Sequence, residues 1–219
     1  MSIFGKEYEF TTPLSEDDVR KVKAGDLLYI SGDIWSARSY VLKKFVVDRE
    51  PLPVDTKKMN VFLTGGEGLR PVDKEHTCWD PVPIGVTLGL RFERFFPKLI
   101  EYAGLRCVIT KGNMGPGTRD ACVKFGCLQL TAFGWPVLPR FNEVLKAKVK
   151  DEEVYWREAG MVEALIVYHV GKTGPWLVNM DTRGSVLFNQ IYSPVNDRIA
   201  EVYKKIGLPE DFEYSSLEQ

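Results

Sequence analysis

Short apolar segments that run into glycine recur through the first two thirds of the chain, and they constrain the fold more than any other feature. They comprise 27–31 (LLYIS), 60–66 (NVFLTGG), 105–110 (LRCVIT) and 127–133 (CLQLTAF). Helical patterns lie between them, as at 93–104, where apolar residues recur at three- and four-residue intervals and Gly104 ends the pattern. Strands that alternate with helices in this way predict a mixed α/β domain.

Local patterns predict the remaining elements. Ser15 and Asp18 fit a capping box, which predicts a helix that ends at Gly25. A glycine turn followed by a helix is expected over 32–45, and a loop over 67–83. The last third predicts a helix from Phe141, strands at 161–170 and 175–181, and a turn at 181–185 that leads into a further strand-like segment at 186–191.

The chain divides at residue 192. Residues 1–192 are expected to form a single domain, and residues 193–219 a C-terminal extension. The pattern at 195–207 predicts a helix within this extension, and the acidic end that follows is expected to fray.

Composition is typical of a soluble globular protein, with 44% hydrophobic and 27% charged residues in a chain of 219. The formal net charge of -1 gives no electrostatic basis for binding nucleic acid or an anionic membrane. The N-terminus lacks the basic and apolar regions of a secretory signal, and no apolar run approaches the roughly 18 residues of a membrane span. We therefore expect a cytoplasmic protein with no membrane partner.

The cysteines do not form a metal-ligand pattern. Cys78, Cys107, Cys122 and Cys127 contain no CxxC pair, and the chain has only two histidines. This spacing matches no common motif for zinc or for an iron–sulfur cluster. We expect reduced, partly buried thiols and no metal held by this chain.

Three stretches place cationic or hydroxyl side chains beside glycine, where a predicted strand gives way to a loop or helix. These are SGDIWSARS with Arg38, GVTLGLR with Thr87 and Arg91, and ITKGNMGPG with Lys111. Ligands of open α/β sheets bind at the carboxyl ends of the strands, so these side chains are expected to converge. Two arginines and a lysine would suit a small dianion such as a dicarboxylate.

Each of these residues also has a purely structural interpretation. Arg38 is compatible with a helix surface, Lys111 with an exposed loop, and Thr87 with a hydroxyl that bonds only to backbone. The loop GNMGPG lacks the GxxxxGK[ST] order of a phosphate loop, which argues against nucleotide binding.

The same stretches resemble the C-terminal domain of class I, iron–sulfur-dependent fumarate hydratases. This unit also occurs as the separate beta subunit of two-subunit fumarases and L(+)-tartrate dehydratases. Residues 11–38, TTPLSEDDVRKVKAGDLLYISGDIWSAR, are similar to the family pattern TTPLSEEDVRxLKxGDxVxLSGxIYTAR. PIGVTLGLRF at 83–92 corresponds to a GPTTSxRM-type segment, and GLRCVITKG at 104–112 to a strand followed by GKG. The resemblance covers about residues 10–190 and implies a swivelling β/β/α domain, a mixed sheet flanked by helices.

The resemblance implies roles for four residues. Arg38, Arg91 and Lys111 are expected to hold the substrate carboxylates, and Thr87 to take a proton from the substrate carbon. A [4Fe-4S] cluster is expected on an alpha subunit and not on this chain, which would then be active only with that subunit, in a homodimer or higher heteromer. The implied activity is a hydro-lyase that interconverts malate and fumarate, with L(+)-tartrate or a related hydroxy acid as the alternative.

The candidate site also departs from the family pattern. Val86 replaces a proline before the threonine, and Leu88 and Gly89 replace a threonine and a serine. Phe92 and Glu93 follow Arg91 where methionine and an acidic residue are usual, and SYVL at 39–42 replaces DAAH. These changes favour a different hydroxy acid or, as an alternative of another class, a non-catalytic anion-binding subunit that retains the fold.

Overall fold

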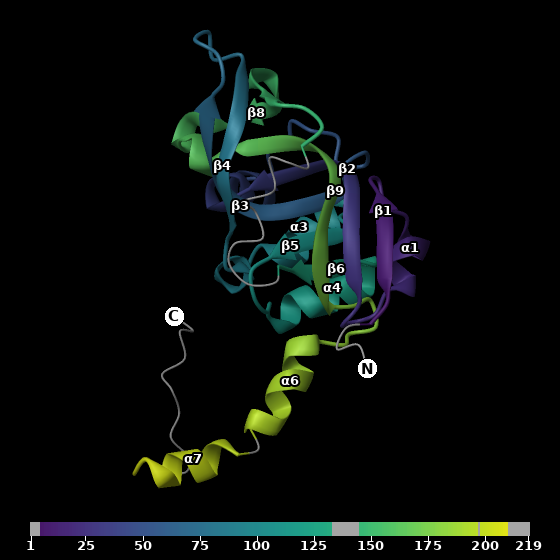
Figure 1. Ribbon diagram of the computed structural model, residues 1–219, viewed down its shortest axis with the longest axis vertical. Coiled ribbons are helices and arrows are strands. Elements are labelled where there is room, and N and C mark those ends of the chain that lie inside the picture. The colour runs from purple at the N-terminus through teal and green to yellow at the C-terminus, as the bar shows by residue number, and fades with distance from the viewer. Residues whose placement is uncertain (1–4, 133–144, 197, 210–219) are drawn as a thin grey trace.

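The computed structural model describes residues 5–132, 145–196 and 198–209 (Figure 1). The described strands are β1 (Glu7–Thr11), β2 (Leu27–Ala37), β3 (Val61–Pro71), β4 (Cys78–Val86), β5 (Cys107–Thr110), β6 (Leu128–Thr131), β7 (Val149–Lys150), β8 (Val154–Tyr155) and β9 (Leu165–Met180). The α-helices are α1 (Glu16–Lys21), α2 (Ser39–Leu42), α3 (Phe96–Ala103), α4 (Pro116–Phe125), α6 (Leu187–Asn196) and α7 (Ile199–Lys205). Short helical turns are η1 (Lys43–Val47), η2 (Gly89–Phe92), η3 (Asp151–Glu153), η4 (Arg157–Ala159) and η5 (Met161–Glu163).

Five strands of the sheet close into a ring. The order around the ring is β2, β9, β6, β5 and β3. The ring closes because residues 62–64 of β3 pair with residues 35–37 at the end of β2. Strands β2, β3, β5 and β6 run parallel, whereas β9 is antiparallel to both of its neighbours in the ring. The carboxyl ends of the four parallel strands therefore meet at one end of the ring.

Alternate side chains of these strands pack into two separate hydrophobic cores. Ile34 and Leu63 belong to one core, which draws on all five strands of the ring. Their neighbours Trp35 and Phe62 belong to the other, where Phe62 packs edge-on against Phe96 of α3. Because both faces of the strands are buried, the segments are continuously apolar rather than alternating in sequence.

The two helices that cover the second core, α3 and α4, both end at a glycine. Gly104 and Gly126 close α3 and α4 in the left-handed conformation, with φ of 62° and 67°. Pro97 lies in the first turn of α3, where its missing N–H costs no hydrogen bond. At α1, the Ser15 side chain accepts from the Asp18 N–H as expected, but the helix ends at Lys21, before Gly25.

Two predictions for the first half of the chain are wrong. The helix expected over 32–45 begins only at Ser39, because β2 continues through Trp35 to Ala37. Gly32, with φ of 99°, lies at a register shift within β2 and not in a turn, so the strand bulges there instead of ending. The loop expected over 67–83 is largely a hairpin, since β3 runs to Pro71 and β4 pairs with it from Cys78.

The last third also differs from its prediction. The expected strands at 161–170 and 175–181 are parts of one long strand, β9, preceded by the turn η5. The segment 186–191, expected to be strand-like, lies mostly in helix α6. The helix expected from Phe141 falls partly outside the described residues, and the described part from Leu145 leads into β7 without forming a helix.

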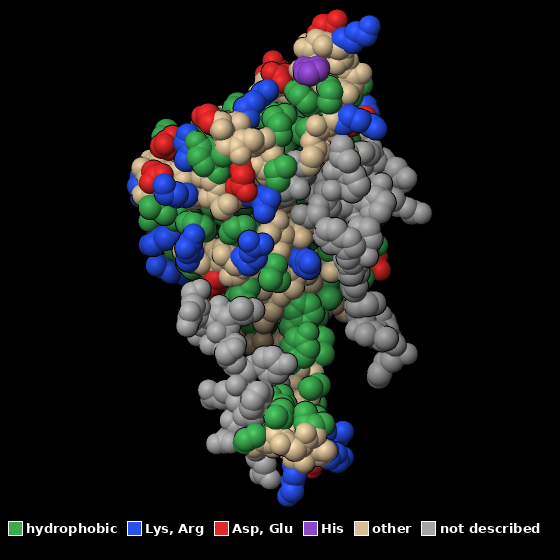
Figure 2. Space-filling model, turned by 90° about the vertical axis from the view of Figure 1, so that its left-hand side faces the viewer, with side chains coloured by type: hydrophobic (Ala, Val, Ile, Leu, Met, Phe, Trp, Pro, Cys, Tyr) green, Lys and Arg blue, Asp and Glu red, His purple; other side chains and the backbone are tan. Residues whose placement is uncertain are grey.

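The C-terminal helices extend away from the body of the molecule (Figure 1). The helix expected over 195–207 is divided between the end of α6 and α7. Apolar side chains lie along this projection (Figure 2), including Ile191, Tyr192, Val195 and Ile206, which are 52–64% exposed. Within the described residues, no helix combines the length and the apolar character needed to cross a membrane.

Candidate active site

The predicted site residues lie at the carboxyl end of the ring. Ala37 pairs with Thr64, and Thr110 pairs with Thr131, so the last residues of β2, β5 and β6 lie in one row with Thr64 of β3. Arg38 directly follows this row on β2, and Lys111 directly follows it on β5. With β3 between them, and neighbouring strands about 4.8 Å apart, the two backbone positions are separated by about 10 Å.

Thr87 joins the same end of the ring through backbone hydrogen bonds. Its N–H donates to the Thr64 carbonyl at 2.7 Å, and its carbonyl accepts from the Lys111 N–H at 3.1 Å. The Gly89 N–H then donates to the Lys111 carbonyl at 3.1 Å. Segment 87–89 is therefore bonded to Thr64 of β3 on one side and to Lys111, which follows β5, on the other, and Thr87 is a spatial neighbour of Lys111.

Gly89 permits this close approach. A Cβ atom at this position would lie 2.2 Å from Met114 Sδ and 2.7 Å from Thr110 Oγ1. The substitution of serine by glycine in this motif is therefore tied to packing between the two loops. Thr87 is presented from a segment that is fixed on both sides by main-chain bonds.

Arg91 lies on η2, four residues after Thr87. Its side chain is exposed, and its guanidinium makes no ion pair with any residue that the structure describes. The structure thus brings Arg38, Thr87 and Lys111 to one end of the ring and leaves the Arg91 side chain in solvent at the edge of the same segment.

Glu93 anchors the segment that carries Thr87 and Arg91. Its carboxylate accepts from the Gly115 N–H at 2.9 Å, from the Thr118 N–H at 2.8 Å and from the Thr118 hydroxyl at 2.6 Å. A Cβ atom on Gly115 would lie 2.7 Å from Glu93 Cδ, so glycine is required for this contact. An internal carboxylate therefore occupies the N-terminus of α4, the position where a phosphate would bind to such a loop.

The sequence analysis did not identify Glu163, which lies in η5, far from Arg38 in the sequence. Its Oε2 accepts from the Ser39 hydroxyl and from the Tyr40 N–H, both at 2.9 Å, and its Oε1 lies 3.6 Å from Arg38 Nε. Glu163 thus caps the start of α2 and fixes the base of the Arg38 guanidinium. No local signal predicts this contact, because the two segments are 124 residues apart.

Two buried polar atoms at this end have no hydrogen-bond partner among the described residues, Arg38 Nε and Thr64 Oγ1. Buried polar groups are rarely left unpaired, and an unpaired group at a candidate site is compatible with a ligand that completes the bonding. Thr64 belongs to the row of paired residues to which Thr87 is hydrogen-bonded, and Arg38 follows that row on β2.

The cysteines lie away from this arrangement. Cys107, Cys122 and Cys127 are buried, and burial raises the pKa of the Cys107 thiol well above its usual range. A hydrogen bond with Cys127, together with burial, likewise raises the pKa of Cys122. No group of three or more His, Cys, Asp or Glu side chains in the described chain could hold a metal ion.

The fold and this site define a mixed α/β domain whose polar side chains gather at the carboxyl ends of its parallel strands. Residues 5–191 match the family model described as Fumarase C-terminus. The chain is 32% identical to the L(+)-tartrate dehydratase subunit beta of Escherichia coli K12 over 196 residues, which cover 87% of this chain and 92% of that protein. The corresponding subunit of Shigella boydii is 31% identical over the same shares.

A Geobacillus stearothermophilus protein, named provisionally as a class I fumarate hydratase, is 27% identical over 86% of this chain. The match covers only 35% of that longer protein. The chain therefore belongs to the fumarase C-terminal domain family, and the family resemblance inferred from its motifs is confirmed.

Proposed function

We propose that this chain is the beta subunit of a hydro-lyase that reversibly removes water from a small hydroxydicarboxylate such as malate, with L(+)-tartrate or a related hydroxy acid as the alternative. The observation that carries this proposal is the pair of main-chain bonds that fixes Thr87 beside Lys111, at the same strand ends as Arg38. The kinship with tartrate dehydratase beta subunits supports the reaction class.

In this proposal, the cations bind the substrate and the threonine moves a proton. Arg38, Arg91 and Lys111 hold the two carboxylates, arginine through paired N–H groups and lysine as a point charge. Thr87 accepts the proton from the carbon next to a carboxylate. The enolate-like charge that develops there is stabilised by the neighbouring cations, which also favour the ionised form of the hydroxyl.

The overall reaction balances without an oxidant or reductant. The C–H electron pair becomes the new carbon–carbon double bond, the proton passes to Thr87, and the hydroxyl group leaves as hydroxide. The release of that proton from Thr87 balances the hydroxide as one water and restores the base. A [4Fe-4S] cluster on an alpha subunit would supply a Lewis acid for that hydroxyl. We place it on the partner because the described residues of this chain provide no ligand set.

The domain arrangement forms part of the same proposal. Residues 1–192 act as one swivelling domain that closes over the partner's half of the site, and residues 193–219 are an extension outside it. The chain alone is then inactive, and the functional unit is a heteromer.

Replacing Thr87 by alanine tests the proposal. In an anaerobically purified complex with the alpha-type subunit, Thr87→Ala is expected to lower kcat by about 100- to 10,000-fold, because a positioned acid–base group contributes that much. The assay follows fumarate hydration and the dehydration of malate and L(+)-tartrate. Thr77→Ala, at an exposed threonine of the β3–β4 hairpin, is the matched control and should retain full activity.

The alternative, a non-catalytic anion-binding subunit, has its support in the altered residues around Thr87. Substrate binding without turnover in the wild-type complex would favour it over the enzyme. Full activity of Thr87→Ala would refute the role given to this hydroxyl, even if the complex is a hydro-lyase.

A further inference from the structure

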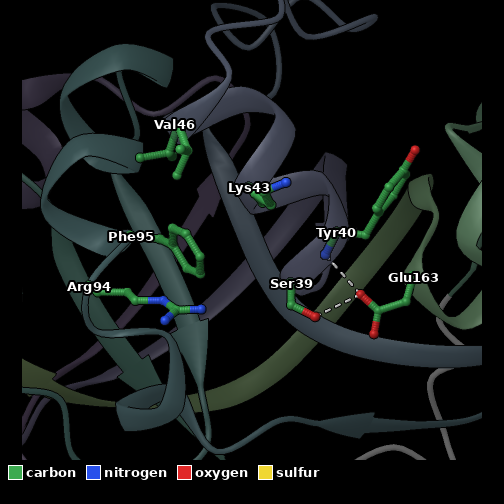
Figure 3. A pocket seen from close by; sticks show the side chains of 8 residues that line it. Ser39, Tyr40, Lys43, Val46, Arg94, Phe95 and Glu163 are labelled. Atoms are coloured by element: carbon green, nitrogen blue, oxygen red, sulfur yellow. Dashed lines mark hydrogen bonds between the residues drawn. The ribbon is translucent and has the colours of Figure 1, made fainter.

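A cavity of about 610 Å³ adjoins Arg38 (Figure 3). Ser39, which follows Arg38, and Glu163, which lies 3.6 Å from its Nε, both line this cavity. One wall comes from α2 and η1, and the opposite wall from Arg94 and Phe95 at the start of α3. Arg38 does not itself line the cavity, but its neighbour in the chain and its carboxylate partner do.

The cavity is large for the acids considered so far. Volumes of roughly 300–1,000 Å³ are typical of sites for drug-sized ligands, and a four-carbon diacid is much smaller than such ligands. An acid of that size held by Arg38 would leave most of the volume unfilled. The volume favours a substrate with an additional group.

The lining indicates what that group would be. Tyr40, Val46 and Phe95 present aromatic and aliphatic surface to the cavity, and Phe95 is almost fully buried. Hydrocarbon transferred from water to such surface is stabilised in proportion to the area covered. A hydrocarbon branch suits these three side chains.

Two cations at the cavity fit an acid as its occupant. Arg94 makes no ion pair with a described residue and lies over the Phe95 ring, and Lys43 Nζ lies 3.8 Å from Asp48 Oδ2. Figure 3 shows the Arg94 guanidinium directed toward Ser39 across the cavity. A neutral apolar ligand would gain nothing from these charges, but the carboxylates of a branched diacid would.

The segment that lines this cavity is also a segment in which the chain departs from its family. Ser39 and Tyr40 stand in the SYVL stretch that replaces DAAH, and Lys43 follows it directly. Two of the residues that line the cavity, Ser39 and Tyr40, thus differ from the family pattern.

We propose that this cavity is the pocket for a substituent of the substrate, and that the substrate is a hydroxydicarboxylate with an alkyl or aryl branch on the carbon that loses the proton. This inference rests on the proposed hydro-lyase function. Arg38 holds the carboxylate next to that carbon, and the branch extends between Tyr40, Val46 and Phe95. The reaction is otherwise unchanged, with one C–H and one C–O bond broken and one double bond and one water formed.

The test uses the anaerobic complex and a series of malates with hydrogen, methyl, isobutyl or benzyl on the carbon that loses the proton. Each buried methylene contributes about 0.8 kcal/mol, or roughly fourfold in kcat/KM. The isobutyl acid is therefore expected to exceed malate in kcat/KM by at least tenfold. Equal or lower kcat/KM for every branched acid, with malate turned over, would overturn the inference and leave the hydro-lyase function intact.

A cavity-filling variant locates the effect. Val46→Trp is expected to lower kcat/KM for the isobutyl acid at least tenfold more than for malate. Val72→Trp is the matched control, because Val72 is 50% exposed at the β3–β4 hairpin, and it should leave the ratio of the two acids unchanged. A ratio that falls equally in both variants, or in neither, contradicts the assignment, and turnover of malate by each variant verifies that it is folded. If the wild-type complex turns over none of the acids, the proposed function itself fails, and this inference fails with it.

Discussion

An arginine at the amino end of the strand ring and an arginine at its carboxyl end differ in the contacts that they make. Arg106 lies just before β5 at the amino end, and Arg38 lies just after β2 at the carboxyl end. Their side chains are almost equally accessible, 23% and 25% exposed, so burial does not distinguish them. Their partners do.

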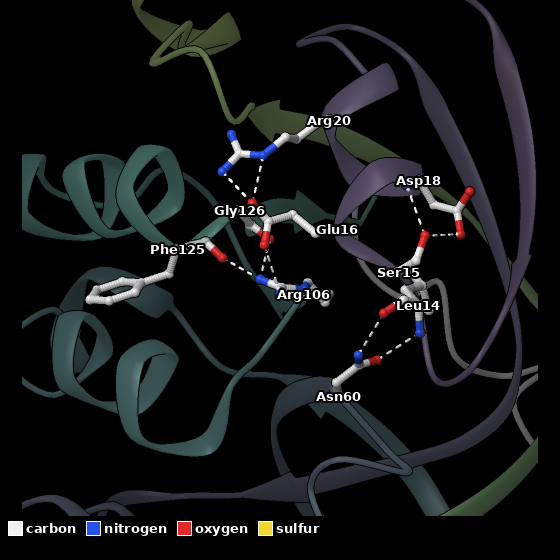
Figure 4. A network of polar contacts seen from close by, with 9 residues as sticks. All are labelled: Leu14, Ser15, Glu16, Asp18, Arg20, Asn60, Arg106, Phe125 and Gly126. Carbon is white, nitrogen blue, oxygen red and sulfur yellow. Dashed lines mark hydrogen bonds and ion pairs between the residues drawn. The ribbon is translucent and has the colours of Figure 1, made fainter.

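Arg106 is fully engaged by the fold (Figure 4). Its Nη1 donates to the carbonyls of Phe125 and Gly126, and its Nη2 donates to Glu16 Oε2 at 3.0 Å. Asn60, just before β3, is similarly engaged, since its side-chain amide exchanges two hydrogen bonds with the backbone of Leu14. At the amino end, polar side chains tie α1 and α4 to the ring.

Arg38 contacts the fold through its Nε, and its side chain makes fewer contacts with the rest of the chain than that of Arg106. Its Nε lies 3.6 Å from Glu163 and has no hydrogen-bond partner among the described residues. Arg91, at the same end, makes no ion pair with the described part of the chain. The amino end thus uses its polar groups for stability, whereas the carboxyl end leaves Arg38 Nε and the Arg91 guanidinium without such contacts among the described residues. In open α/β sheets, this end of the parallel strands is the one where ligands bind.

Of these substitutions, the largest effect is expected at the carboxyl end of the ring, at Arg38. Arg38→Lys keeps a positive charge beside Glu163 but removes the paired N–H groups that suit a carboxylate. A hydrogen bond to a charged group contributes about 1.5–3 kcal/mol, so KM for the acid is expected to rise about 10- to 100-fold. Steady-state kinetics of the complex measure this, and thermal unfolding should be nearly unchanged. A lower Tm with an unchanged KM would show that Arg38 serves the fold.

The same substitution at the amino end should do the reverse. Arg106→Lys removes at least one of the contacts to the Phe125 and Gly126 carbonyls and weakens the contact to Glu16. The expected cost is about 1–2 kcal/mol in the free energy of unfolding, which corresponds to a decrease of roughly 2–8 °C in Tm for a chain of this size. KM and kcat at 25 °C should be those of the wild type, and an increase in KM comparable to that of Arg38→Lys would remove the distinction between the two ends.

The contrast also explains what could be predicted from the sequence. Lys111 was located correctly at a strand end because it directly follows a short apolar segment, and that transition is a local signal. Arg38 also lies at a strand end, but only because β2 continues past the predicted segment 27–31 to Ala37. Thr87 was expected to converge with them because its segment also follows a predicted strand, but nothing in 83–92 indicates the main-chain bonds that join it to Thr64 and Lys111. Their proposed roles in the reaction remain predictions.

Contacts between distant segments were not predictable. Glu163 reaches Arg38 only because β9 closes the ring, and Glu93 reaches Gly115 only because α3 and α4 pack together. Tertiary context also overrode local preference at Trp35, where the pairing of β2 with β9 and β3 extends a strand through a segment with a helical pattern. Propensity is a weak guide wherever a segment is paired on both sides.

The smallest expected effect concerns a site away from either end, and it separates electrostatic stabilisation from ligand binding. His169 on β9 lies between two carboxylates, with Nδ1 2.7 Å from Asp33 Oδ1 and Nε2 2.5 Å from Glu153 Oε1. Burial lowers the pKa of His169, but the hydrogen bonds with Glu153 and Asp33 outweigh it, so the pKa is raised above its ordinary value of 6.5.

Because the pKa is higher in the folded chain than in the unfolded chain, protonated His169 stabilises the fold fully below pH 6.5. This contribution is lost as the pH rises through the raised pKa. Urea unfolding of the wild type and of His169→Gln should therefore differ more at pH 6 than at pH 8.5. The side chain is one third exposed and so partly screened by solvent, which makes the expected difference modest. A difference in unfolding free energy that does not change with pH would mean that His169 acts as a neutral hydrogen-bonding group. Altered kcat or KM of His169→Gln at pH 6 would mean that His169 also affects the candidate site.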